Sequence, residues 1–173
     1  MRKVSLMLLI LITAFACLPA FAAAEDQRFY PLYRLYHPGL RDHLYTANLG
    51  EVESAKTAGY IFEATYGNLS SRELFENQSP LYRLYNPKTR RHFYTDDNDE
   101  LAQAVLRHGY GLEGILGFLR VSSDSSEAGT VYRLYNLSTG DHLYTDSWVE
   151  WGLLQLSGWT SEGVLKGRMY DNF

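Results

Sequence analysis

The chain has 173 residues, with sixteen Lys or Arg against twenty Asp or Glu, so its formal net charge is −4. An acidic chain repels the phosphate backbone of nucleic acid and the surface of anionic lipid, so neither is an expected partner. The fourteen tyrosines are more than a core of this size needs, and Tyr combines a flat apolar face with a polar tip that suits recognition.

The N-terminus has the pattern of a secretory signal peptide. Two basic residues precede an apolar run, and small residues follow at the spacing of a cleavage site. Residues 1–24 are therefore predicted to be a leader that is cleaved after Ala22 or Ala24, and the mature chain is expected to be secreted or periplasmic. A lipoprotein anchored through Cys17 is the rival interpretation, but Ala14 stands where bacterial lipidation requires Leu.

Removal of the leader limits what the mature chain can do. It contains no Cys and can form no disulfide, and its fourteen basic residues face twenty acidic ones. No second long apolar run follows, so no stable membrane insertion is expected. We expect a monomer without a cofactor.

From residue 29 onwards one sequence unit occurs three times. A Tyr-Arg-Leu-Tyr word is followed by a turn and by a second word that begins with His and ends at Thr46, Thr95 or Thr145. Such self-similarity is typical of repeat architectures. The mature chain, residues 25–173, is therefore predicted to be a single domain of three repeats, at about 29–70, 78–121 and 130–173.

Each pair of words reads as a β-hairpin, because polar and apolar residues alternate on both sides of a turn. In the first copy, Leu35 and Leu44 are the natural core pair on one face of the hairpin. The opposite face of each hairpin then carries one Arg, two Tyr and one His.

A short helix and a third strand complete each repeat. Two residues after the second word ends come helix-capping residues, with a Glu three positions further on, at Asn48/Glu51, Asp97/Glu100 and Ser147/Glu150. The helices are predicted to end at Gly59, Gly109 and Gly158. A returning strand with a Glu follows (Glu63, Glu113, Glu162), with room for a fourth strand near 66–67, 116–119 and 165–170.

The expected fold is a β-rich α+β domain of three strand-strand-short helix-strand repeats. An open array of only three such repeats would leave sheet edges exposed. Closure about a pseudo-threefold axis, in a β-trefoil-like arrangement, is therefore the first expectation.

The words YRLYNPKTRRHFYT and YRLYNLSTGDHLYT resemble the signature of a family of secreted repeat domains of unknown function. The resemblance covers the chain from about Phe29. Because such units are similar to modules attached to cell-wall or polysaccharide enzymes, it implies carbohydrate or envelope binding by association. The chain departs from the signature in its first turn, 37–41, and at Arg90 and Arg91, which replace Gly-Asp, so the middle repeat is suspected of having diverged.

The polar hairpin faces are the candidate sites, because Tyr rings can stack on a pyranose while charged groups bind its hydroxyls. The candidate ligand-binding residues are Arg34, Tyr36, Asp42, His43, Tyr45, Arg83, Tyr85, His92, Tyr94, Arg133, Tyr135, Asp141, His142 and Tyr144. The same residues could instead form a hydrogen-bonded network that joins each hairpin to its own or the neighbouring repeat. Repetition alone does not separate the two interpretations.

Other chemistry receives less support from the sequence. Three equivalent His could converge as a zinc site, but their spacing is far longer than that of a local metal motif, so no metal is expected. No catalytic residue is assigned, because the mature chain lacks recognisable hydrolase motifs and the three repeated Glu are expected to be solvated or bonded to the hairpins. Among the unrepeated tryptophans, Trp151 and Trp159 are expected to fill core volume and Trp148 to be exposed.

The sequence therefore favours an exported non-catalytic binding module whose partner is a glycan or another cell-envelope component. A structural or protein-interaction domain of the periplasm or cell surface is the alternative, and a cell-wall or polysaccharide hydrolase is a second alternative.

Overall fold

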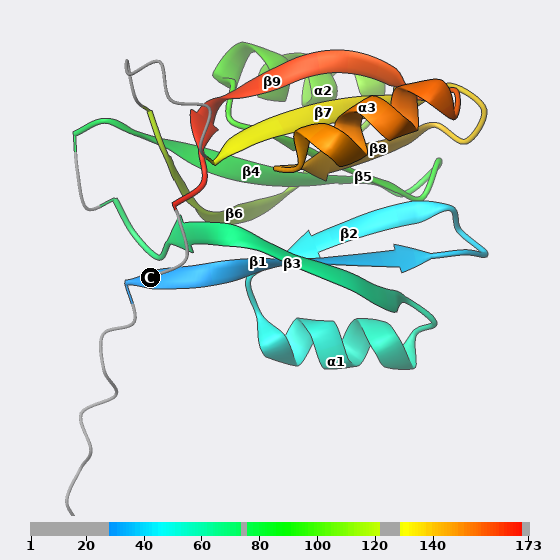
Figure 1. The fold of residues 1–173 in the computed structure, drawn as a ribbon, viewed down its shortest axis with the longest axis horizontal. Helices are drawn as coiled ribbons and strands as arrows, with labels where there is room; N and C mark the ends of the chain where they lie inside the picture. The colour runs from blue at the N-terminus through cyan, green and yellow to red at the C-terminus, as the bar shows by residue number, and fades with distance from the viewer. Residues whose placement is uncertain (1–27, 74–75, 122–128, 171–173) are drawn as a thin grey trace, which may run out of the picture.

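The structure, a computed structural model, describes residues 28–73, 76–121 and 129–170 (Figure 1). The predicted leader and Cys17 lie outside these residues. No helix in the described part of the chain is long and apolar enough to cross a membrane.

The order strand, strand, helix, strand occurs three times along the chain, and we call the three segments units 1, 2 and 3. Unit 1 contains β1 (Phe29–His37), β2 (Asp42–Thr46), α1 (Leu49–Thr57) and β3 (Ile61–Ser70). Unit 2 contains β4 (Gln78–Asn86), β5 (Arg91–Thr95), α2 (Asn98–His108) and β6 (Gly111–Arg120). Unit 3 contains β7 (Thr130–Asn136), β8 (Asp141–Thr145), α3 (Trp148–Leu156) and β9 (Thr160–Arg168).

The predicted hairpins are confirmed in position and register. β1 pairs with β2 so that Leu35 lies opposite Leu44, and the other two hairpins have the same register. The third strand of each unit pairs antiparallel with the first strand of the hairpin through bulges. The residues considered for a fourth strand belong to the third strand instead: 66–67 lie in β3, 116–119 in β6 and 165–168 in β9, and Tyr170 forms an isolated bridge.

The units are joined into one antiparallel sheet, so the expectation of a β-rich fold is confirmed. Short contacts link β3 to β6 through Ser70 and Phe118, and β6 to β9 through Arg120 and Arg168. A further bridge joins Asn68 to Tyr170. The strand order shows an antiparallel sheet with β2 and β8 at the ends of its main path, and does not by itself show a β-trefoil.

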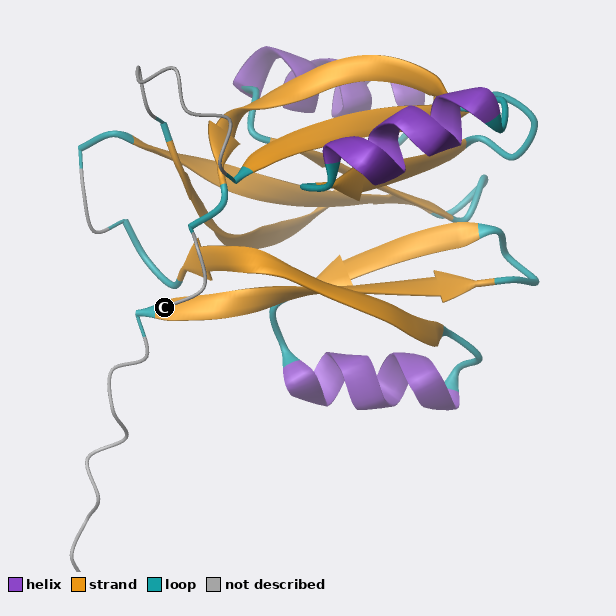
Figure 2. Ribbon diagram, viewed as in Figure 1, coloured by secondary structure: helices purple, strands orange, loops and turns teal. Residues whose placement is uncertain are grey.

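Each helix covers the leucine face of its own hairpin, which leaves the helices on the outside of the strands (Figure 2). In unit 1, Val52 and Ala55 of α1 pack on Leu35 and Leu44. In unit 2, Ala104 of α2 packs on Leu84 and Phe93. Burial of these apolar side chains, at about 25 cal/mol per Å² removed from water, holds each helix to its hairpin.

The predicted N-terminal helix caps are confirmed, but the Glu of each capping box has another role. At the other end, α2 has the predicted Gly109 as its C-cap, whereas α1 and α3 have Ala58 and Ser157, one residue before the predicted Gly. The side chains of Asn48, Asp97 and Ser147 accept backbone N–H groups of the first helical turn. The backbone N–H of each capping residue is bound by the hydroxyl of the preceding Thr, at 3.0–3.1 Å. The Glu side chain that would normally bind this N–H is therefore free to reach a neighbouring unit.

Candidate functional site between the units

The polar hairpin faces meet where neighbouring units touch. We call the contact between units 1 and 2 joint 1–2, that between units 2 and 3 joint 2–3, and that between units 3 and 1 joint 3–1. Most of the residues that the sequence proposed as ligand contacts lie at these joints, so each joint is described by its Tyr, Arg and His in turn.

Tyr45, Tyr94 and Tyr144 lie together at the centre of the largest apolar cluster, with exposed fractions of 1 %, 1 % and 3 %. The hydroxyl of Tyr94 accepts the backbone N–H of Tyr45 at 2.8 Å, that of Tyr144 accepts the N–H of Tyr94 at 2.9 Å, and that of Tyr45 accepts the N–H of Tyr144 at 2.7 Å. Each hydroxyl also donates to a carbonyl of the same set.

This tyrosine ring is closed on itself. Burial raises the pKa of all three phenols, so they are neutral donors. With every hydroxyl bonded and every ring buried, no ligand can stack on these side chains in this structure. The contacts of these three residues are those of the structural network that the sequence left as an alternative.

The three arginines form ion pairs that connect the units. The Nε of each arginine lies close to a carboxylate oxygen of the Glu in the third strand of its own unit, at 2.8 Å for Arg34, 2.8 Å for Arg83 and 3.0 Å for Arg133. These contacts are ion pairs, because their geometry is not that of a hydrogen bond. Each also binds the first-turn Glu of a helix in the neighbouring unit, at 2.8 Å, in the pairs Arg34–Glu150, Arg83–Glu51 and Arg133–Glu100. The Glu side chains that do not close the capping boxes therefore bind these arginines.

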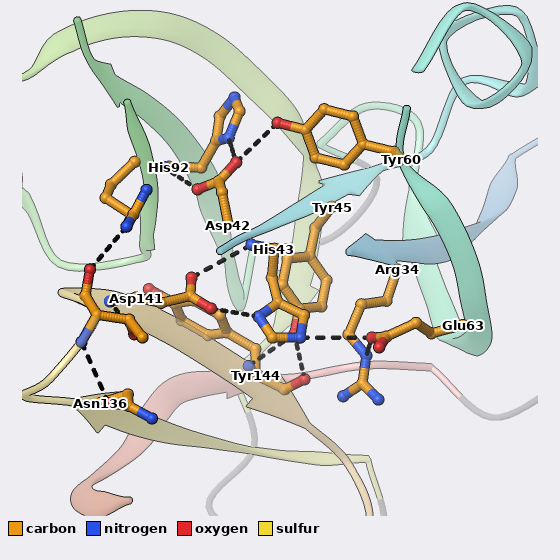
Figure 3. A network of polar contacts seen from close by, with 12 residues as sticks. Arg34, Asp42, His43, Tyr45, Tyr60, Glu63, His92, Asn136, Asp141 and Tyr144 are labelled. Carbon is orange, nitrogen blue, oxygen red and sulfur yellow. Dashed lines mark hydrogen bonds and ion pairs between the residues drawn. The ribbon is translucent and has the colours of Figure 1, made fainter. Parts of the chain in front are cut away.

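Two of the histidines bind an aspartate across a joint (Figure 3). At joint 3–1, His43 Nδ1 lies 2.6 Å from Asp141, and at joint 1–2, His92 Nδ1 lies 2.7 Å from Asp42. Asp42 also accepts the hydroxyl of Tyr60 at 2.9 Å. Burial alone would lower the pKa of His43, but Asp141 and Glu63 outweigh it and raise the pKa above its ordinary value.

Joint 2–3 differs because Arg91 stands where the other joints have an aspartate. Its guanidinium turns to the carbonyl of Thr139, at 2.7 Å from Nη2 and 3.1 Å from Nε. The buried Nδ1 of His142 therefore has no hydrogen-bond partner among the described residues. Burial, with the charge of Arg133, lowers the pKa of His142 to about 4, so this ring is neutral at pH 7.

The replacement of Asp by Arg91 in the middle repeat thus affects the next unit along the chain. The sequence placed its effect within the repeat that contains Arg91, but the Asp of one unit serves the His of the next. His92, in the middle repeat, keeps its partner, whereas His142 in unit 3 has lost one.

The second tyrosine of each Tyr-Arg-Leu-Tyr word keeps part of its ring accessible. Tyr36, Tyr85 and Tyr135 are half-buried, and each packs on the His of its own hairpin with ring centroids 4.7, 4.9 and 4.8 Å apart. The three His do not form a metal site, because no group of three His, Cys, Asp or Glu in the described segments could hold an ion.

Two open clefts lie at the joints. Cleft 1–2 has a volume of about 500 Å³, and its lining includes Tyr30, Tyr33, Ala47, Glu51, Arg83 and Leu116. Cleft 2–3 has a volume of about 390 Å³, and its lining includes Glu100, Tyr110, Arg133, Tyr135, His142 and Glu162. Both volumes are in the range of small-molecule sites.

Sequence reasoning missed cleft 1–2. Alternation puts Tyr33 on the leucine face, and Tyr33 does pack on the cluster of Leu35 and Leu44 while it also lines the cleft. Tyr30 and Ala47 are not repeated in the other units. The only sequence signal was the break in the repeat itself, because Ala47 aligns with Asp96 and Asp146.

These features define a β-rich domain of three units that are locked together by buried tyrosines, Arg–Glu pairs and His–Asp pairs, with clefts between units. The chain belongs to the family described as a domain of unknown function, DUF5648, whose model matches residues 31–170. No curated protein and no solved structure matches the chain.

Proposed function

We propose that this chain is an exported, non-catalytic module that binds a carbohydrate or cell-envelope glycan in the clefts between its units. The observation that carries the proposal is that each cleft sets tyrosine rings beside an Arg–Glu pair. In cleft 1–2, Tyr33 lies with Arg83 and Glu51, and in cleft 2–3, Tyr135 lies with Arg133 and Glu100.

This combination suits a sugar. A pyranose has an apolar face that packs on an aromatic ring, and hydroxyls that need both donors and acceptors. Guanidinium groups supply donors and carboxylates supply acceptors. The Arg–Glu pairs are already fixed by contacts across the joints, so little side-chain ordering would oppose binding.

We extend the proposal to the architecture, in which three equivalent units close about a pseudo-threefold axis in a β-trefoil-like manner. The cyclic hydrogen bonds of Tyr45, Tyr94 and Tyr144 support it, because the backbone N–H of each tyrosine donates to one neighbouring unit and its hydroxyl accepts an N–H from the other.

Glycan arrays and pull-downs with isolated cell wall test the binding function, with the chain from residue 25 as the probe. Tyr33→Ala and Tyr135→Ala are each expected to weaken binding at least about tenfold, as loss of an aromatic anchor does. The matched controls are Tyr132→Ala and Tyr36→Ala, which change the equivalent tyrosines of other units, outside the linings of both clefts. If no glycan binds, or if the double variant Tyr33→Ala/Tyr135→Ala binds like the wild type while circular dichroism stays native, the proposal fails.

The non-catalytic part has its own test. Purified protein is incubated with the glycans that it binds, and products are followed by mass spectrometry. If the protein hydrolyses a glycan, and the triple variant Glu63→Gln/Glu113→Gln/Glu162→Gln does not, the chain is a hydrolase and the non-catalytic part of the proposal is refuted.

A specific observation favours a second candidate, a protein-interaction domain. α3 exposes Trp148 and Leu156 at 70 % and 86 %, so the expectation that Trp148 is exposed is confirmed. The equivalent position to Leu156 in α1 is Thr57, so the fold does not need an apolar residue there. If Trp148→Gln/Leu156→Gln abolishes binding to cell-envelope fractions while Tyr33→Ala/Tyr135→Ala does not, this second candidate replaces the first.

A further inference from the structure

The three joints differ at the residue that follows the repeated Thr. At joint 2–3 this residue is Asp96, whose carboxylate accepts the backbone N–H groups of Lys166 and Gly167 at 3.2 and 2.6 Å. At joint 3–1 it is Asp146, which accepts the N–H of Gly67 at 3.3 Å. Two joints therefore place a carboxylate against the backbone of the neighbouring third strand.

At joint 1–2 the equivalent residue is Ala47, which cannot supply a carboxylate. The matching positions on the neighbouring strand β6 are Leu116 and Gly117. Ala47 and Leu116 both line cleft 1–2, so this cleft opens at the place where the other joints have an aspartate.

The arginine of this joint also differs from the other two. Arg34 and Arg133 each bind their helix Glu through both Nη1 and Nη2. Among the described residues, Arg83 hydrogen-bonds Glu51 through Nη1 alone, at 2.8 Å, and its side chain lines the cleft. A guanidinium that binds one carboxylate through a single Nη has N–H donors left for a second carboxylate.

Part of the wall of cleft 1–2 is apolar and lies beside the polar side chains of Asn48, Glu51 and Arg83. Tyr30 and Tyr33 of β1 form one part, and Leu49 and Ile115 contribute side chains that are 62 % and 51 % exposed. A bound ring would remove this apolar surface from water.

We propose that cleft 1–2 binds an acidic glycan through the carboxylate of a uronate residue, which takes the place that Asp96 and Asp146 occupy at the other joints. The carboxylate meets Arg83 and the backbone of β6, and the ring packs on Tyr33. This inference rests on the proposed glycan binding and adds the chemical class of the ligand.

Two electrostatic effects oppose this ligand, and neither decides the outcome. Glu51 and Glu113 bring negative charge to the joint, but at joint 3–1 the carboxylate of Asp146 lies close enough to Arg34 and Glu150 for their charges to act on it, so the fold accommodates a carboxylate near an equivalent Arg–Glu pair. The net negative charge of the chain acts over longer distances and is screened within about 8 Å at physiological ionic strength.

The test compares two probes that differ only in their carboxylates, tri-galacturonate and its methyl ester, by titration calorimetry at 0.15 M salt. The wild type is expected to bind the acid at least about tenfold more tightly than the ester, because the ester removes the charge that Arg83 recognises. Ala47→Asp is expected to weaken binding of the acid at least about tenfold, because it places a like charge in the carboxylate position.

Ala47→Asp installs the residue that the other two joints already contain, so the variant should fold, and circular dichroism checks this. Ala47→Ser is the matched control without a charge, and it is expected to keep the preference for the acid. The comparison of acid and ester on the wild type tests the inference even if Ala47→Asp is unstable.

The outcomes separate this inference from the proposed function. If acid and ester bind equally and Ala47→Asp changes neither affinity, the acidic-glycan site is refuted while glycan binding stands. If a tri-glutamate peptide binds as tightly as tri-galacturonate, the site recognises carboxylates without a sugar, and the glycan part is refuted here. If no glycan of any charge binds, both proposals fail.

Discussion

The substitution Arg91→Asp tests how the joints are held together. At joints 3–1 and 1–2, an aspartate at the equivalent position binds a buried His Nδ1 at 2.6 and 2.7 Å. At joint 2–3, the Nδ1 of His142 has no such partner among the described residues. The substituted side chain would supply the missing carboxylate, and the hydroxyl of Tyr110, the counterpart of Tyr60, could bind it as well.

The expected gain is modest at pH 7 and larger in acid. A hydrogen bond to a charged group contributes about 1.5–3 kcal/mol, and the loss of the bonds from Arg91 to Thr139 costs about 1 kcal/mol. We therefore expect Arg91→Asp to raise the free energy of unfolding by about 1 kcal/mol at pH 7.

The pH dependence follows from the sign of each pKa shift. In the wild type the pKa of His142 is lowered to about 4, so the unfolded chain binds its proton first as the pH falls below 6.5, and stability is lost. This loss amounts to about 2 kcal/mol at pH 5. In Arg91→Asp the pKa of His142 should rise above 6.5, as that of His43 does, so its charged form adds stability as the pH falls through the raised pKa, and this stability is fully present below pH 6.5. The advantage of the variant over the wild type should therefore grow from pH 8 to pH 5.

Two measurements check this reasoning. NMR titration of the His ring protons gives the pKa of His142 in each protein, and urea unfolding at pH 8, 7, 6 and 5 gives the stability difference. Arg91→Asn is the matched control, because it removes the guanidinium without adding a charge. If Arg91→Asn stabilises as much as Arg91→Asp at pH 5, or if the pKa of His142 stays below 6 in Arg91→Asp, the Asp–His explanation of the joints is wrong.

Two further predictions concern stability. Tyr94→Phe removes a hydroxyl that serves the backbone N–H and carbonyl of Tyr45, and it should cost about 2–4 kcal/mol in urea unfolding, whereas Tyr85→Phe at a half-buried ring should change stability by less than about 0.5 kcal/mol. Equal losses for the two variants would contradict a structural role for the tyrosine ring. Arg90 has a positive φ of 57°, so Arg90→Gly should relieve backbone strain, stabilise the fold by up to about 1 kcal/mol and raise the thermal midpoint. Gly140 occupies the equivalent turn position with φ 73°, so Gly140→Ala should lower the midpoint.

The local parts of the fold could be predicted because they depend on neighbours in the sequence. The pairing of Leu35 with Leu44 follows from alternation across one turn, and the cap at Asn48 follows from a pattern within four residues. The destination of Glu51 could not be predicted in this way. The hydroxyl of Thr46 accepts the backbone N–H of Asn48, which the carboxylate of Glu51 would otherwise accept. The carboxylate of Glu51 instead binds Arg83 in unit 2.

The same limit explains why the sequence left two interpretations of the polar hairpin faces open. Alternation placed Arg34, His43 and Tyr45 together on the face opposite the leucines, but it carries no information about what covers that face. In the structure each hairpin is covered on one side by its own helix and on the other by neighbouring units, so Arg34, His43 and Tyr45 are buried. A sequence pattern distinguishes the two sides of a strand, whereas only the tertiary contacts decide which side meets solvent.

Differences between repeats are therefore best interpreted at the joint and not within the repeat where they occur. Joint 3–1 keeps both aspartates, Asp141 on His43 and Asp146 on Gly67, and it is the internal reference for what the fold needs. Each of the other joints has only one of the two, because Ala47 and Arg91 stand at the other position, and cleft 1–2 and cleft 2–3 lie at these joints. In this structure joint 1–2 therefore forms without a carboxylate at position 47, and joint 2–3 forms without one at position 91, while each retains the other Asp contact.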